Sequence, residues 1–208
     1  MKAKNNDNAL GLGAFLALWV IVSAFGWLAA FILYEIDFLN VSDHGSVSYV
    51  LLLSVVPGLP LSLLQARLVA PKFNIEPKFW FLISMLGWLC SASVLHYVFN
   101  TYLDFPEPRV LIATLFAPAA IVQWLFLLNN RAKGAWLWVV SAIISAFVFG
   151  YIGDVLADIS RDGEGFQILL TAGTQSLVTG GVMWWLMQQP QAKAQKVKQS
   201  RSPFSPTD

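Results

Sequence analysis

Between residues 10 and 188 the chain consists of six apolar blocks, each close to twenty residues long and separated by short polar segments. A helix needs about 20 apolar residues to cross a hydrocarbon core roughly 30 Å thick, so blocks of this length are typical of membrane spans. The composition agrees, because 57% of the residues are hydrophobic and 12% are charged, against about 25% charged in a soluble domain. The sequence therefore predicts an all-α, integral membrane six-helix bundle. The expected spans are residues 10–33, 47–69, 79–99, 110–128, 135–156 and 166–187.

The polar ends flank one transmembrane domain, which covers residues 10–188. Residues 1–9 form a short N-terminal segment, and its neighbouring apolar block is longer than the roughly 7–15 residues of a signal-peptide core. Residues 189–208 are rich in Gln, Lys, Ser and Pro, a composition that does not form a packed core. We expect this segment to be a disordered basic tail.

The positive charges alternate between the two sides of the predicted bundle. The N-terminal segment, the second and fourth connections and the tail hold 2, 3, 2 and 4 of the 13 Lys and Arg residues, if Arg67 at the end of the second span is counted with the second connection. Positive residues favour the cytoplasmic side, so both termini are expected there. The predicted location is a multi-pass position in a bacterial inner or thylakoid-type membrane.

An internal repeat relates three helix pairs. Trp80 follows Gln65 by fifteen residues, and Trp138 follows Gln123 by the same interval. Thr179 takes the Gln position in a third copy, at separations of 58 and 56 residues along the series. A second pattern, SAFGWL, SMLGWL and SAFVFG, recurs at residues 23–28, 84–89 and 145–150. Because each copy holds two spans, the sequence predicts three parallel two-helix repeats around a pseudo-three-fold axis.

The polar in-span residues Gln65, Gln123 and Thr179 have two interpretations. They tie neighbouring helices together, because an amide in hydrocarbon needs a hydrogen-bond partner. Alternatively, they form a polar ring near the axis that a solute touches. The first interpretation is favoured, since interhelical polar contacts are common in membrane bundles.

A carboxylate and histidine group is expected on the far side. Glu35 and His96 each lie twelve residues after the Ser of their repeat, and Asp158 lies thirteen after Ser145. Together they are candidates to bind a divalent cation or a proton, because a His beside carboxylates titrates near neutral pH. The competing interpretation is that they are ordinary charges near the membrane interface, where charge costs little.

The segment that begins at Asp158 also contains half of a calcium-binding pattern. Asp158, Ser160, Asp162 and Gly163 match its first positions, but the twelfth position is Leu169 where an EF-hand loop has a bidentate Glu. An ordinary Asp/Gly turn explains the same residues.

Motifs of enzymes are missing from the sequence. It contains no H-E-x-x-H, no G-x-S-x-G and no Gly-rich phosphate loop. The single cysteine, Cys90, lies within an apolar run and forms no metal motif. We therefore expect no enzymatic activity, no catalytic residues and no cofactor.

The repeated Gly/Pro-x-x-x-x-Gln-Trp-Leu stretch, the basic turn after it and the closing TGGVMWWLM resemble a group of uncharacterised, Trp-rich bacterial membrane proteins of cyanobacterial type. The resemblance covers most of residues 10–188. It implies the same polytopic architecture and assigns no activity.

These observations predict a non-enzymatic membrane protein that acts as a scaffold or assembly component. Its expected partners are membrane lipids and either further copies of the chain or a larger membrane complex, without nucleic acid. The alternative function is a small-solute or ion transporter with a polar pathway on the pseudo-axis.

Overall fold

The computed structural model describes residues 11–35, 47–101, 108–159 and 164–189, and these residues are almost entirely helical. The all-α prediction is confirmed for this part of the chain, which contains no strand. The elements are α1 (Leu12–Glu35), α2 (Val47–Leu68), η1 (a 3-10 helix, Ala70–Phe73), α3 (Pro77–Thr101), α4 (Pro108–Gln123), η2 (a π-helix, Trp124–Leu128), α5 (Trp136–Ile159) and α6 (Glu164–Gln188).

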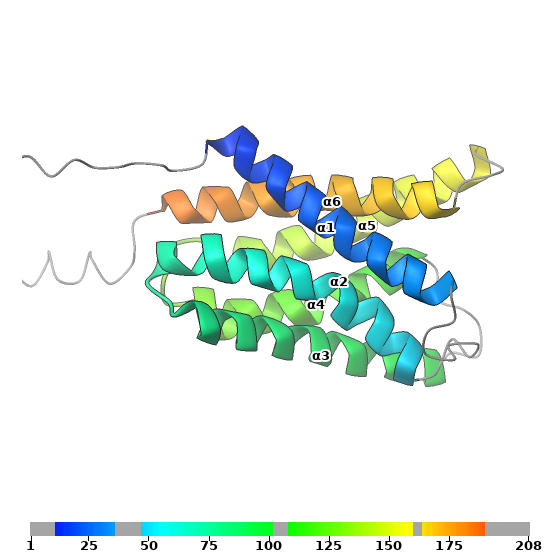
Figure 1. Cartoon of the computed structure of the whole chain (residues 1–208), viewed down its shortest axis with the longest axis horizontal. Coiled ribbons are helices and arrows are strands. Elements are labelled where there is room, and N and C mark those ends of the chain that lie inside the picture. The colour runs from blue at the N-terminus through cyan, green and yellow to red at the C-terminus, as the bar shows by residue number, and fades with distance from the viewer. Residues whose placement is uncertain (1–10, 36–46, 102–107, 160–163, 190–208) are drawn as a thin grey trace, which may run out of the picture.

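The six α-helices form a closed ring of neighbours. Each packs against the helix before and after it in the chain, and α6 packs against α1. Figure 1 shows the helices side by side, with α1 lying obliquely across α6. The first and last helices are therefore partners in the same way as consecutive ones.

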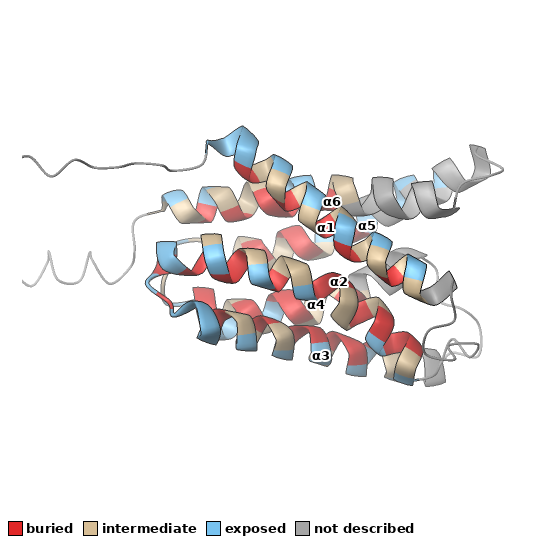
Figure 2. Cartoon of the chain, in the orientation of Figure 1, coloured by how far each residue is buried: buried red, intermediate tan, exposed pale blue. Residues whose placement is uncertain are grey.

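Large apolar side chains cover the outside of the ring. Ile21 on α1 and Leu82 on α3 are each 63% exposed, and Phe25 is 64% exposed. Figure 2 shows exposed positions along the outer faces and buried positions on the faces that meet other helices. A helix that is apolar on both faces is typical of a membrane environment. By length and composition, three of the described helices can cross a membrane: Leu12–Leu33, Val47–Leu68 and Pro77–Val98.

Glycines allow two pairs of helices to approach closely. A Cβ atom at Gly26 of α1 would lie 2.8 Å from the carbonyl oxygen of Pro57 on α2. A Cβ atom at Gly87 of α3 would lie 3.0 Å from the Cα atom of Ala119 on α4. Small residues at such positions let helix backbones pack against each other in membranes. These two glycines occupy the same place in the SAFGWL and SMLGWL sequences.

Two turns meet at one end of the bundle, which we name the basic end. Arg131, in the turn after η2, donates from one guanidinium nitrogen to the backbone oxygens of Phe73 and Asn74, both at 3.3 Å. Asn74 (φ 53°) and Gly134 (φ 76°) adopt left-handed conformations that reverse the chain. The described charged side chains all lie in or beside these turns: Arg67, Lys72, Glu76, Lys78, Arg131 and Lys133.

The interior is built around aromatic and small side chains. The larger cluster, toward the basic end, contains the fully buried indoles of Trp19 and Trp80 together with Phe15 and Trp138. A smaller cluster, around Leu52 of α2, lies farther along the helices. The larger cluster surrounds the buried polar side chains of Gln65, Ser84 and Gln123.

Candidate functional site

A buried hydrogen-bond network joins four helices, and Gln123 is its centre. The Gln123 amide nitrogen donates to Oε1 of Gln65 at 2.8 Å and to Oγ of Ser84 at 2.9 Å. The Gln123 amide oxygen accepts from Nε1 of Trp138 at 3.0 Å. Gln65 Oε1 also accepts from Nε1 of Trp80 at 3.3 Å. The network therefore links α2, α3, α4 and α5 through side chains alone.

The two indoles determine how both amides are oriented. An indole N–H only donates a hydrogen bond, so Trp80 and Trp138 must each face an amide oxygen. This leaves the Gln123 nitrogen to donate to Gln65 and Ser84. Both glutamines are nearly inaccessible, with 1% of Gln65 and 3% of Gln123 exposed. Because water does not reach these side chains, the loss of any partner would leave a buried polar group without a hydrogen bond.

The turns at the basic end place each Trp beside its Gln. Trp80 lies in the first turn of α3, where its backbone N–H donates to the backbone oxygen of Glu76. Trp138 lies in the first turn of α5, where its backbone N–H donates to the backbone oxygen of Ala135. Gln65 and Gln123 lie in the last turn of α2 and of α4. A helix end, a short turn and a helix start thus bring residues fifteen apart in the chain into contact.

Aromatic rings enclose the network and keep it dry. Phe73 stacks on Trp80 with ring centroids 6.0 Å apart, and Trp19 meets Trp138 edge-on at 6.4 Å. Phe15 packs between Trp19 and Trp184, at 5.3 and 5.2 Å. These contacts exclude solvent from the amides and hold the indole N–H groups in position.

Thr179, the third residue of the predicted polar set, does not join the network. Its hydroxyl donates to the backbone oxygens of Gln175 and Ser176 on its own helix, at 3.1 and 3.4 Å. The neighbouring Gly180 lies against the indole of Trp19, since a Cβ atom there would be 3.0 Å from the ring. The Nε1 of Trp19 and Nε2 of Gln175 are buried without a hydrogen-bond partner among the described residues. Gln65 and Gln123 are thus brought together, and Thr179 is not.

The predicted carboxylate and histidine group is only partly described. His96 is half-buried on α3. The side chains of Glu35 and Asp158, and the whole of Asp162, lie outside the described residues. Among the described side chains, no group of three or more His, Cys, Asp or Glu residues is placed to hold a metal ion. The cation hypothesis therefore remains a prediction.

Sequence reasoning did not identify the role of the Trp and Ser residues in this network. The repeated Gln-to-Trp spacing of fifteen was the available signal, but spacing does not reveal that the indole donates to the amide. Ser84 is the first residue of SMLGWL, and its hydrogen bond to Gln123 could not be inferred from that position.

Comparison with known proteins found no relative of this chain. No family model matches the chain, and no curated protein and no solved structure shows significant similarity to it.

Proposed function

We propose that the chain is a six-span membrane protein with a structural role, acting as a non-enzymatic scaffold or assembly component. The observation that supports this most is the pairing of Gln65 with Gln123 inside the bundle. Amides that bond to each other and to two indoles hold helices together, and the Gln123 amide nitrogen and the Gln65 amide oxygen each have two partners already.

A repeated architecture is part of the proposal. Gln65 with Trp80 and Gln123 with Trp138 make the same contact across α2–α3 and α4–α5. Because α6 packs against α1, Thr179 and Gly180 with Trp19 take the corresponding place in a third pair. This arrangement supports three parallel two-helix repeats around an axis along the membrane normal. The distribution of Lys and Arg along the sequence favours a cytoplasmic position for both termini.

A transporter is the competing function, but it would require the buried network to open, which costs free energy. A solute that used Gln65 and Gln123 would have to break the 2.8 Å bond between them and separate the aromatic rings around them. Each interhelical hydrogen bond in a membrane bundle contributes about 0.6–1.7 kcal/mol. The network therefore favours a closed interior over an open polar pathway.

Cysteine cross-linking in native membranes tests the scaffold role. With Cys90 replaced by Ser, single cysteines at Ile21, Leu82 and Ile144 place thiols on exposed faces of α1, α3 and α5. A scaffold should give one discrete cross-linked product, from one face only, with a short bifunctional thiol reagent. Ser84→Cys, which is fully buried, is the matched position that should give none.

Reconstitution into liposomes supplies the opposing readout. If the chain is a scaffold, gradients of small ions and neutral solutes should dissipate at the same rate as in empty liposomes. Solute flux that Gln123→Leu abolishes, with no cross-linked product from any face, would support the transporter instead.

A further inference from the structure

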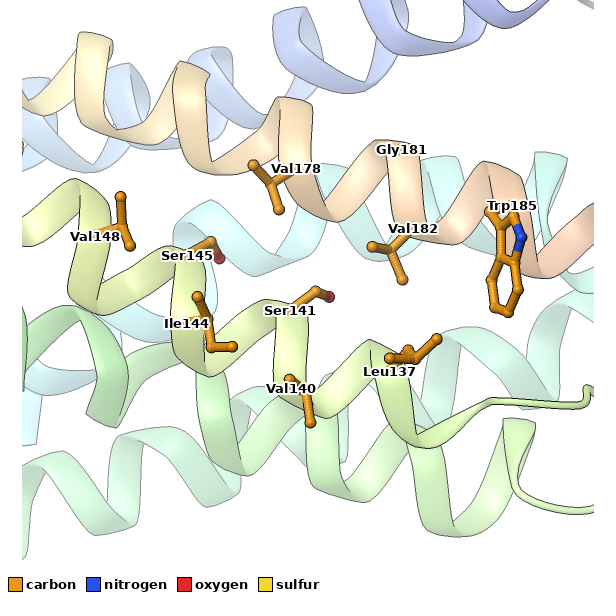
Figure 3. A pocket seen from close by; sticks show the side chains of 10 residues that line it. All are labelled: Leu137, Val140, Ser141, Ile144, Ser145, Val148, Val178, Gly181, Val182 and Trp185. Carbon is orange, nitrogen blue, oxygen red and sulfur yellow. The ribbon is translucent and has the colours of Figure 1, made fainter.

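An apolar groove runs between α5 and α6 on the outside of the ring. It has a volume of about 440 Å³, within the roughly 300–1,000 Å³ common for ligand pockets. Figure 3 shows side chains of both helices pointing into the space between them. The lining residues are Leu137, Val140, Ser141, Ile144, Ser145, Val148, Val178, Gly181, Val182 and Trp185.

The groove lies where α5 lacks the glycine found in α1 and α3. Gly26 and Gly87 allow close packing of α1 on α2 and of α3 on α4. The residue in the same place of SAFVFG is Val148, which lines the groove. On the α6 side, a Cβ atom at Gly181 would have no other atom within 4 Å. The helices therefore leave space here that they close elsewhere.

The groove offers mainly hydrocarbon contacts, and its two serines use their hydroxyl protons within α5. The hydroxyls of Ser141 and Ser145 donate to backbone oxygens of their own helix, those of Trp138 and Ala142, at 2.9 and 3.2 Å. Along this aliphatic stretch, away from the indole of Trp185, a polar occupant would lose its hydration and gain little in return. Only an apolar chain suits the lining.

The length of the groove matches one leaflet of a bilayer. Its α5 wall extends from residue 137 to residue 148, which is about 16 Å at 1.5 Å per residue. This is close to half of a hydrocarbon core roughly 30 Å thick. A single acyl chain fills such a length, whereas a membrane-spanning helix would extend well beyond it.

One end of the groove reaches the basic end, close to a turn that carries positive charge. Trp185 lines the groove and lies against Gly134, where a Cβ atom would be 3.0 Å from the indole. The turn that holds Gly134 also carries Arg131 and Lys133. Arg131 already donates to the Phe73 and Asn74 carbonyls, and Lys133 is exposed. A Trp and a Lys at the membrane surface suit the glycerol and headgroup region of an anionic lipid.

We propose that this groove binds one anionic phospholipid, with an acyl chain along α5 and α6 and its headgroup at Lys133. The inference rests on the proposed membrane location and is independent of the scaffold role. Carbonate washing tests the membrane location separately, because release of the chain from membranes would contradict that location. Lipid binding is then measured on protein that stays in the membrane after the wash.

Native mass spectrometry of the delipidated full chain measures the binding directly. The probes are phosphatidylglycerol and phosphatidylcholine with identical acyl chains. Gly181→Leu fills the groove and should reduce retention of both lipids by at least about fivefold, since each buried methylene contributes substantially to apolar binding. Lys133→Gln should reduce the preference for phosphatidylglycerol by about fivefold, the effect of one Lys near an anionic surface.

Matched variants separate the groove from general effects. Gly13→Leu adds the same side chain at another glycine whose Cβ would meet nothing, and Lys78→Gln removes an exposed charge elsewhere at the basic end. Both should retain lipid as the unmodified chain does. Equal loss in Gly181→Leu and Gly13→Leu would overturn the groove assignment. An unchanged headgroup preference in Lys133→Gln would overturn the anionic headgroup site.

Photo-cross-linking tests the same proposal without altering the protein. A phosphatidylglycerol with a diazirine in its acyl chain should label residues 137–148 and 178–185 above the other helices. Even labelling of all outer faces would show bulk lipid contact only and would contradict a specific site.

Discussion

Replacing Gln123 with Leu should lower the free energy of unfolding by about 2–4 kcal/mol. The side chain makes three hydrogen bonds, to Gln65, Ser84 and Trp138, each expected to contribute about 0.6–1.7 kcal/mol in a membrane bundle. Leu is similar in size and leaves little cavity, so the loss comes mainly from the bonds. The indole N–H of Trp138 would stay buried without an acceptor, which lowers the free energy of unfolding further.

The assay is reversible unfolding in mixed micelles, followed by Trp fluorescence and by helical circular dichroism. The control is Gln188→Leu, the same substitution at an exposed position near the end of α6, which should change stability by less than about 0.5 kcal/mol. A double-mutant cycle with Gln65→Leu should give a coupling energy of about 0.6–1.7 kcal/mol for the 2.8 Å bond. If Gln123→Leu were as stable as Gln188→Leu, the network would not hold the helices together.

Three further predictions follow from the packing. Thr179→Gln should be more stable than Thr179→Met by about 1 kcal/mol, because only the Gln offers an acceptor to the unpaired Nε1 of Trp19; equal unfolding midpoints would contradict the proposed third pair. Gly87→Val should cost about 1–3 kcal/mol, since its Cβ would press on the Ala119 backbone, whereas Gly13→Val should be tolerated in the same unfolding assay; equal stability of the two variants would contradict the close approach of α3 and α4. Asn74→Val should destabilise the basic end by about 1–2 kcal/mol more than Asn74→Gly, because φ is 53° there; equal stability of the Val and Gly variants would contradict the backbone strain.

The helical class followed from the sequence because hydropathy alone determines where a chain can enter hydrocarbon. Several helix ends lie beyond the apolar runs. The run beginning at Phe79 predicted a span over residues 79–99, whereas α3 covers Pro77–Thr101. Pro77 suits the first helical position, where a missing N–H costs nothing, and hydropathy does not report such backbone effects.

The polar centre was only partly predictable. Gln65 and Gln123 stood out because amides are rare in apolar runs, but both interpretations of them fitted the same spacing. What decides between pairing and exposure is which side chains face each other across α2 and α4, and that depends on helix rotation. The π-helix at Trp124–Leu128, directly after Gln123, shows that even the helical period changes locally in a way the apolar pattern does not reveal.

The groove between α5 and α6 was missed, although a residue difference beside it is visible in the sequence. SAFVFG has Val148 where the other two copies have glycine. Without knowing that Gly26 and Gly87 form close helix contacts, the difference had no structural meaning.

The central claim is that the polar centre of the bundle is dry and serves to join helices. Thiol accessibility tests it most directly, in a Cys90→Ser background with single cysteines at Ser62, Ser84 and Thr179, which are small and buried. A small water-soluble thiol reagent should leave all three unlabelled in intact membranes, while cysteines at the exposed positions Asn130 and Lys133 react fully. Labelling at all three buried positions would mean that water reaches the polar centre, and the closed-core account would be wrong.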